Sequence, residues 1–141
     1  MEYNIQTTHW NKNKSALSEI RHKVFIEEQN VPEELEWDEF DDDCIHILAT
    51  ENSIPIACGR LKTDGHIGRM AVLEAYRKKG VGSSILEGLL NTAKNLSLTE
   101  VYLHAQLTAI PFYEKFGFET CSEEFMDANI PHKTMKKTLN N

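Results

Sequence analysis

The sequence predicts a single α/β domain in which helices cover both faces of a mixed, mostly antiparallel sheet of six to seven strands. The chain has 141 residues, the length of one domain with a core of its own. Its hydrophobic spacing changes repeatedly between alternating and helical. Three successive strand patterns joined by short turns indicate an antiparallel meander, whereas the strand–helix–strand unit at 70–101 requires a parallel neighbour.

The first half of the chain predicts a strand, a helix and then the meander. Alternation over residues 2–7 indicates a short strand. Helical spacing of apolar residues predicts an amphipathic helix over 14–28, and Pro32 prevents its continuation. The strands of the meander are expected at 44–50, 54–62 and 66–72, with turns at 52–53 and 63–65.

The second half predicts two helices that alternate with strands. The most regular helical pattern covers 80–96, where apolar residues form one stripe. A strand at 100–105 follows, and then a short helix at 108–115 that Gly117 ends. Two final strands are expected near 118–125 and 132–138. The whole of residues 1–141 is therefore interpreted as one domain.

The negative charge of the chain is concentrated in one segment. The chain has 15 basic and 22 acidic residues, a net charge of −7, which argues against nucleic-acid and membrane-surface binding. Residues 33–43 hold eight acids and no base, so the remainder carries a slight positive charge. Leu35, Trp37 and Phe40 interleave with the acids, and we expect them to dock the segment on the domain. The segment is either a solvated loop or a field that attracts a cationic amine.

Cysteine usage and hydropathy indicate a cytoplasmic protein. The three cysteines, Cys44, Cys58 and Cys121, form no C-x-x-C pair and are interpreted as buried structural thiols. The first residues lack the pattern of a secretion signal, and no apolar run reaches the roughly 18 residues of a membrane helix. No cysteine–histidine set has zinc spacing, so no metal is expected.

One turn combines three cations, two glycines and the start of the long helix. Its residues are Arg77, Lys78, Lys79, Gly80, Val81, Gly82 and Ser83. The first turn of a helix presents unpaired N–H groups and a partial positive charge, and glycines let the backbone approach an anion. The P-loop pattern is absent, and Ile85 replaces the third glycine of the dinucleotide fingerprint. The turn is either a pyrophosphate cradle or a charged cap on a core helix.

Two blocks of sequence resemble the GNAT acetyltransferase superfamily. The first is Arg77-x-x-Gly80-x-Gly82, and the second is Ala109-x-x-Phe112-Tyr113-x-x-x-Gly117-Phe118. Further segments at 21–32, 68–72, 104–106 and 130–135 resemble the ElaA-type branch of this superfamily. The resemblance implies the GNAT-like acyl-coenzyme A transferase fold. It also implies transfer of an acetyl group from acetyl-coenzyme A to an amine.

The resemblance also implies which residues hold acetyl-coenzyme A. The turn at 77–83 would grip its pyrophosphate, and the strand segment Met70, Ala71 and Val72 would pair with the pantetheine arm. A backbone N–H of Ala71 or Val72, freed by a bulge, is the expected oxyanion donor. Many members of the family have Asn where this chain has Gln106, so a hydrogen bond to the coenzyme or the nearby backbone is expected to differ.

Tyr113 is the candidate general acid for the departing thiolate. A phenol has an ordinary pKa near 10 and carries a proton at neutral pH. The resemblance places this residue beside the sulfur of the coenzyme. On the residues alone, the favoured interpretation of Tyr113 is a core aromatic beside Phe112 and Phe116, and the resemblance reverses that order.

The base that deprotonates the amine is left open. Glu28 lies at the end of the first helix, where members of the family build the acceptor pocket, and His132 lies in an Ile-Pro-His segment shared with the ElaA-type branch. Gln29 is expected to contact the acceptor. Three further candidates are histidines, which titrate near pH 6.5: His46, His66 and His104. A water relay without a single base is the remaining alternative.

Two other functions fit the same sequence. One is a non-catalytic acyl-coenzyme A binding or sensor module on the same scaffold, and the other is an unrelated phosphate-ligand domain. For the enzyme, the expected partner is a small-molecule or peptide amine, with no nucleic acid and no membrane. A homodimer is possible because dimers are common in the family.

Overall fold

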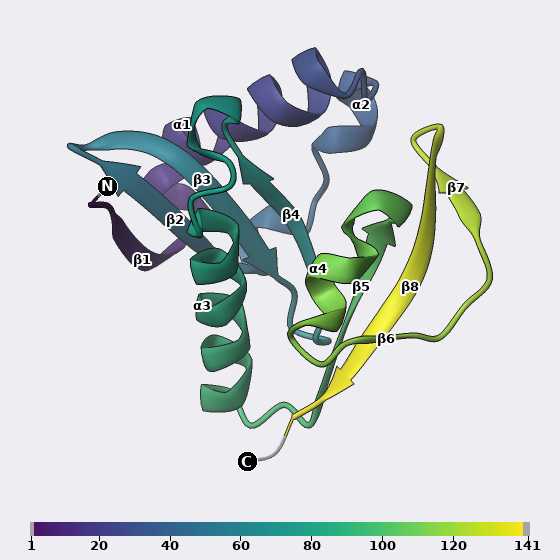
Figure 1. Ribbon diagram of the computed structural model, residues 1–141. Helices are drawn as coiled ribbons and strands as arrows, with labels where there is room; N and C mark the ends of the chain where they lie inside the picture. Colours follow the sequence, from purple (N-terminus) through teal and green to yellow (C-terminus); the bar gives the residue numbers. More distant parts are fainter. Residues whose placement is uncertain (1, 140–141) are drawn as a thin grey trace.

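The computed structural model describes residues 2–139 and folds them into two sheets with helices around them (Figure 1). Residues 1 and 140–141 of the predicted domain lie outside the described residues. The strands are β1 (Asn4–His9), β2 (Ile45–Glu51), β3 (Ile54–Leu61), β4 (Ile67–Val72), β5 (Glu100–Gln106), β6 (Glu119–Thr120), β7 (Phe125–Asp127) and β8 (Ile130–Thr138). The helices and helical turns are α1 (Trp10–Arg21), η1 (His22–Glu28), α2 (Glu33–Glu36), η2 (Asp41–Asp43), η3 (Glu74–Tyr76), α3 (Val81–Asn95), η4 (Leu107–Ala109) and α4 (Ile110–Glu114).

The strands form two four-stranded antiparallel sheets that meet at a single point. One sheet has the order β1-β2-β3-β4, and in the other β5, β6 and β7 all pair with β8. Between them the described residues show one parallel bridge, His66 with Tyr102, where the Tyr102 N–H donates to the Gly65 carbonyl at 3.0 Å. Beyond this bridge β4 and β5 diverge (Figure 1). The predicted mixed, mostly antiparallel fold is confirmed. The parallel pairing that was predicted for the strand–helix–strand unit consists of this one bridge.

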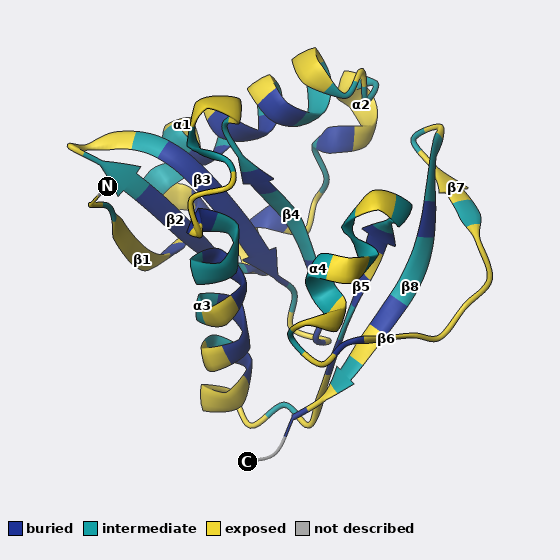
Figure 2. Ribbon diagram, in the orientation of Figure 1, coloured by how far each residue is buried: buried dark blue, intermediate teal, exposed yellow. Residues whose placement is uncertain are grey.

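Helices pack on both faces of the first sheet, as predicted. Along β2, Ile47 and Ala49 face the core that includes α3, whereas Leu48 between them joins the core that includes α1. This alternation follows from the two-residue period of a strand. The α3 side continues under the second sheet, where Val101 and Met135 belong to the same core. Figure 2 shows this buried layer between α3 and the strands.

The predicted helix at 14–28 has two different windings. Asn13 is non-helical at φ −130°, so regular helix begins after it, close to the predicted start. From His22 to Glu28 the chain is a π-helix, in which the Gln29 N–H donates to the Val24 carbonyl at 3.1 Å. Hydrophobic spacing over so few residues does not distinguish the two windings. Such π segments are frequent at functional sites.

The predicted strand at 118–125 is two short strands, β6 and β7, with a loop between them. The Cys121 N–H still donates to the Thr134 carbonyl at 2.9 Å, so the loop follows β8 without a regular ladder. Gly117 ends the preceding helix as predicted, with φ at +89°.

The acidic segment at 33–43 docks on the domain through buried ion pairs. Three of its acids are paired with three arginines that come from α1, β3 and β4. The pairs are Arg21 Nε with Glu36 at 2.7 Å, Arg21 Nη1 with Asp41 at 2.8 Å, Arg60 Nη1 with Asp38 at 2.9 Å and Asp41 at 3.0 Å, and Arg69 with Glu36 at 3.1 Å and Asp38 at 3.2 Å.

The apolar residues of this segment contribute less to docking than the sequence suggested. Leu35 and Phe40 remain exposed, and Trp37 is half-buried with the Arg21 guanidinium 5.1 Å from its ring centroid. Burial alone would raise the pKa of Asp41, but hydrogen bonds and charges from Arg21 and Arg60 outweigh it and lower that pKa. The segment is therefore held mainly by charge pairing. Sequence alone could not show it, because the arginines are distant in the chain.

The cysteines match their expected role in two cases out of three. Cys44 and Cys58 are buried, and burial raises the pKa of Cys58 to about 12. Cys121 is exposed, contrary to the prediction, although its N–H still bonds to β8. Within residues 2–139, no helix has the length and apolar character needed to cross a membrane.

Candidate active site

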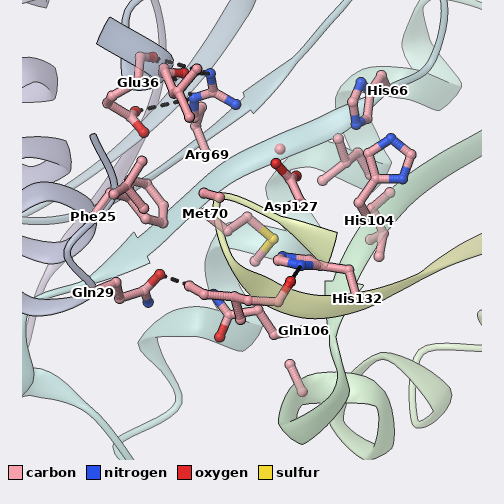
Figure 3. Close-up of a pocket in the computed structure, with 18 of the residues that line it drawn as sticks. Phe25, Gln29, Glu36, His66, Arg69, Met70, His104, Gln106, Asp127 and His132 are labelled. Carbon is pink, nitrogen blue, oxygen red and sulfur yellow. Dashed lines mark hydrogen bonds and ion pairs between the residues drawn. The ribbon is translucent and has the colours of Figure 1, made fainter. Parts of the chain in front are cut away.

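A cavity of about 370 Å³ lies where the two sheets separate (Figure 3). Its walls come from η1, α2, β4, β5, α4 and the β7–β8 hairpin. The residues that matter for its chemistry are Gln29, Glu36, His66, Arg69, Met70, His104, Gln106, Tyr113, Asp127 and His132. The cavity therefore brings together Tyr113, His132, Gln29, Gln106 and Met70, all of which the sequence nominated.

The turn before α3 has the backbone conformation of an anion site. Lys78 and Gly80 have positive φ angles of 62° and 83°. Gly80 is the N-cap of α3, and no side chain caps the helix. The N–H groups of the first turn are thus open to a ligand. Lys78 and Lys79 are exposed and make no ion pair in the described part of the chain, so their charges add to the positive end of the helix.

Arg77, which the resemblance placed at the diphosphate, makes three hydrogen bonds within the protein. Its Nε donates to the Val72 carbonyl at 2.9 Å, and its Nη1 and Nη2 donate to the Glu28 carboxylate at 2.5 and 2.6 Å. The guanidinium thus braces the turn against the end of β4 and against η1.

The same pairing makes Glu28 a poor candidate for the base. The hydrogen bond from Arg77 lowers the pKa of Glu28, which weakens it as a proton acceptor. Glu28 also lies outside the residues that line the cavity. We therefore assign it a positioning role beside the turn.

β4 contains a bulge at Arg69 and Met70, which overlaps the segment Met70–Val72 that was expected to carry one. Cys58 is paired with Ala71 and Arg60 with Gly68, so Arg69 and Met70 both stand opposite Gly59. Arg69 has a φ of +51°, an uncommon conformation that its ion pairs hold in place. Because β4 is the last strand of its sheet, its outer edge has no strand paired along it beyond the bulge. On this edge the Val72 carbonyl accepts from Arg77 Nε.

Tyr113 projects from α4 towards the bulge. Its ring contacts Phe112 and Phe118 with centroids 5.1 and 5.9 Å apart, and its hydroxyl lies 3.7 Å from Met70 Sδ. Burial raises the pKa of Tyr113 to about 12. The phenol is thus a proton donor across the whole physiological range, and it is both a core aromatic and a cavity group.

His132 is held in one orientation by a hydrogen bond to its own strand. It is a buried residue of β8, and its Nδ1 lies 2.7 Å from the Ile130 carbonyl oxygen. A carbonyl can only accept, so Nδ1 carries a proton, and in the neutral imidazole the lone pair is on Nε2. Phe125 stacks on the imidazole with centroids 6.0 Å apart. This arrangement fixes both the tautomer and the ring.

The three other histidines that are candidates for the base lie in two different places. His66 and His104 line the cavity in edge-to-face contact at 4.8 Å, and burial followed by the His104 charge lowers the pKa of His66 to about 4. Burial also lowers the pKa of His104, so both are neutral at pH 7. His46 lies outside the cavity, with Nε2 3.0 Å from the Asp41 carbonyl oxygen, and is part of the buried network.

Gln29 and Gln106 are bonded to each other across the cavity. The Gln106 Nε2 donates to Gln29 Oε1 at 3.0 Å, which connects the end of η1 with the end of β5. The departure from asparagine at position 106 is thus matched by a longer side chain that reaches η1. Among residues 2–139, no group of three or more His, Cys, Asp or Glu residues is arranged to hold a metal ion.

Several residues of the cavity wall were not nominated from the sequence, and three of them bear on its shape and charge. Phe25 comes from the π-helix, Arg69 from the bulge and Asp127 from the hairpin before β8. A turn signal was present for the last of these, because Ala128 and Asn129 form a two-residue turn with φ angles of 50° and 64°. The other two depend on local windings that the spacing of apolar residues does not reveal.

Comparisons with known proteins find relatives that are similar in sequence and in fold. Residues 11–139 match the family model described as an acetyltransferase (GNAT) domain. The uncharacterized N-acetyltransferase YjcF of Bacillus subtilis is 38% identical over 133 residues, covering 89% of this chain and 95% of its own length. The crystal structure of Escherichia coli ElaA has a TM-score of 0.86 at 31% identity, covering 96% of this chain and 99% of that one. An acyl-CoA N-acyltransferase from Pseudomonas aeruginosa gives 0.87 at 31% identity, with the same coverage.

Proposed function

This chain belongs to the GNAT acetyltransferase family, and on that premise we propose that it moves an acetyl group from acetyl-coenzyme A to an amine by direct attack. The observation that carries this proposal is the position of His132 and Tyr113 on one cavity. His132 presents a lone pair and Tyr113 a proton, beside the bulged edge of β4. Direct acetylation of an amine needs a base and an acid, and these two groups would fill those roles.

The residues around the turn before α3 fit the coenzyme. The open N–H groups of Val81, Gly82 and Ser83 would bind the diphosphate, with Lys78 and Lys79 adding charge. The free edge of β4 at Met70–Val72 would pair with the amide groups of the pantetheine arm, as an added strand pairs with a sheet edge. Acetyl-coenzyme A supplies the activated acetyl thioester.

His132 Nε2 would take the proton from the amine, directly or through one water. The amine nitrogen then forms a bond to the acetyl carbon, and the carbon–sulfur bond breaks. An N–H of Ala71 or Val72, beyond the bulge, would stabilise the negative oxygen that develops between these events. Tyr113 Oη would donate its proton to the departing sulfur, and solvent restores both groups. The acceptor is a small-molecule or peptide amine.

Tyr113→Phe should lower turnover at least about tenfold, with little change in the dissociation constant of coenzyme A. The reason is that only the phenol proton is lost, while the ring keeps its contacts. Because the pKa of Tyr113 is raised to about 12, the phenol keeps its proton below that value. Wild-type turnover should therefore not decline between about pH 8 and 10. Steady-state kinetics over this range, with calorimetric coenzyme binding, would test both points; full turnover in the variant would exclude Tyr113 as the acid.

Gly80→Val should weaken coenzyme A binding by about tenfold or more, because a β-branched residue is strained in this backbone conformation. Gly80 has φ at +83°, and straightening it would redirect the N–H groups of the turn. Gly82→Ala is the matched variant: its new Cβ would lie 3.7 Å from Val72 Cγ2, an ordinary contact, so the loss should be smaller. Isothermal titration with coenzyme A compares the two. Equal affinity in the wild type and Gly80→Val would argue against the turn as the diphosphate site.

The alternative function is a non-catalytic acyl-coenzyme A sensor. It would use the same turn and the same β4 edge but would need neither base nor acid. Release of free coenzyme A from acetyl-coenzyme A, measured with a panel of primary amines, distinguishes the two. Tight coenzyme binding without release on any amine would favour the sensor. The fixed lone pair of His132 favours the enzyme.

A further inference from the structure

One charged residue of the cavity makes no ion pair with any other residue that the structure describes. The charged side chains that line the cavity are Glu36, Arg69 and Asp127. Glu36 is paired with Arg21 and Arg69, and Arg69 is also paired with Asp38, so these charges are compensated. Asp127 is an exposed residue of β7, and within residues 2–139 it makes no ion pair and accepts no hydrogen bond at its carboxylate. Its charge acts on His104, whose pKa it raises against the larger effect of burial. Asp127 leaves one uncompensated negative charge on the cavity wall.

Asp127 occupies a fixed position relative to His132. The two lie on neighbouring strands, with Phe125 opposite His132 and Asp127 opposite Ile130. Residues two apart on a strand share a face, so Asp127 and His132 are diagonal neighbours about 7–8 Å apart. The two-residue turn at Ala128 and Asn129 holds this register. Figure 3 shows both side chains around the same cavity.

The rest of the wall favours a cation and an alkyl chain near Asp127. His66 and His104 are neutral at pH 7, and the one arginine is already paired. Ile130 lies between Asp127 and His132 along the hairpin, and Phe25 and Met70 add apolar surface. A carboxylate accepts only, and its strongest partners are charged N–H donors. The cavity thus has the Asp127 carboxylate at one end and His132 at the other, with apolar side chains between them.

We propose that the acceptor carries a second ammonium group, which Asp127 binds while the first amine reacts at His132. The substrate class is a diamine, or the terminal part of a polyamine, with a short alkyl chain between its nitrogens. This inference rests on the proposed function for the reacting amine. The Asp127 site itself is a binding site and has its own test.

The test compares butane-1,4-diamine with butylamine, which has the same chain and lacks the second nitrogen. Wild-type kcat/KM should be at least about tenfold higher for the diamine. In Asp127→Asn this preference should disappear through a higher KM for the diamine, with kinetics on butylamine unchanged. Asp127→Glu should restore part of the preference. Glu124→Gln is the control, because it removes an equal charge from the preceding loop, outside the cavity lining.

Direct binding separates this inference from the proposed function. Both amines are titrated calorimetrically into the protein saturated with coenzyme A, with and without Asp127→Asn. Diamine binding that depends on Asp127, without acetylation of any amine, would support the Asp127 site and would contradict the proposed acetyltransferase activity. Acetylation of both amines at equal kcat/KM, unaffected by Asp127→Asn, would overturn the Asp127 site and leave the enzyme standing. A preference for an acceptor with a carboxylate would also overturn it, since that would assign recognition to Arg69.

Discussion

His132→Gln is expected to lower kcat by at least about 100-fold, within the range that general base catalysis contributes. The imidazole Nε2 is the acceptor that remains once Nδ1 donates to the Ile130 carbonyl, and glutamine offers no comparable base. The KM for acetyl-coenzyme A should stay close to the wild-type value, since His132 lies away from the turn before α3.

The pH dependence of this variant distinguishes a lost base from a damaged fold. Without His132 the reaction depends on amine that is already deprotonated in solution. The deficit should therefore shrink as the pH approaches about 10.4, the ordinary pKa of an alkylammonium. A merely structural loss would be independent of pH. His9→Gln, an exposed histidine outside the cavity, is the matched control. Wild-type kcat in His132→Gln at pH 7 would exclude His132 as the base.

Arg21→Ala is expected to lower the free energy of unfolding by about 3–5 kcal/mol, because it leaves two buried carboxylates without their shared partner. Arg21 is only 1% exposed and pairs with both Glu36 and Asp41. Its guanidinium also lies 5.2 Å from the Trp10 ring centroid and 5.1 Å from that of Trp37, so apolar packing is lost as well. Urea denaturation followed by tryptophan fluorescence measures the change.

The exposed Glu28–Arg77 pair is the comparison for this experiment. Glu28→Gln removes a charge whose side chain is 37% exposed, so the free energy of unfolding should change by only about 0–1 kcal/mol. A loss below 1 kcal/mol for Arg21→Ala as well would mean that the buried network does not hold the acidic segment. Circular dichroism before denaturation establishes whether Arg21→Ala is folded at all. If it is not, urea midpoints of Arg21→Lys, which keeps the charge but loses the forked geometry, provide the measure.

Local sequence patterns predicted most helices and strands of this chain. The arrangement of the cavity depends instead on contacts between residues that are distant in the sequence. The meander and the long helix were predicted within a few residues, because alternation and helical spacing are local. The π winding of η1 was not, since an extra residue per turn barely changes the spacing of apolar residues over seven positions. The split between β4 and β5 was also missed. Nothing in either strand shows that their pairing stops after one bridge.

The roles of individual residues show the same division. Tyr113, His132 and Gln29 were nominated from the sequence and line one cavity. The role of Glu28 could not be judged, because its partner Arg77 is 49 residues away. The lone pair of His132 depends on a carbonyl two residues earlier, in a geometry that only the fold defines. Asp127 could not be singled out from the sequence, because only the structure shows that the other charged residues of the cavity are ion-paired.

A crystal structure with acetyl-coenzyme A bound tests the central claim most directly. The account predicts diphosphate oxygens within about 3.2 Å of the backbone N–H groups of Val81–Ser83, with the thioester sulfur beside Tyr113 Oη. His132 Nε2 should then face the acetyl carbon across the space left for the amine. A diphosphate bound elsewhere, or a Tyr113 hydroxyl directed away from the sulfur, would contradict the account.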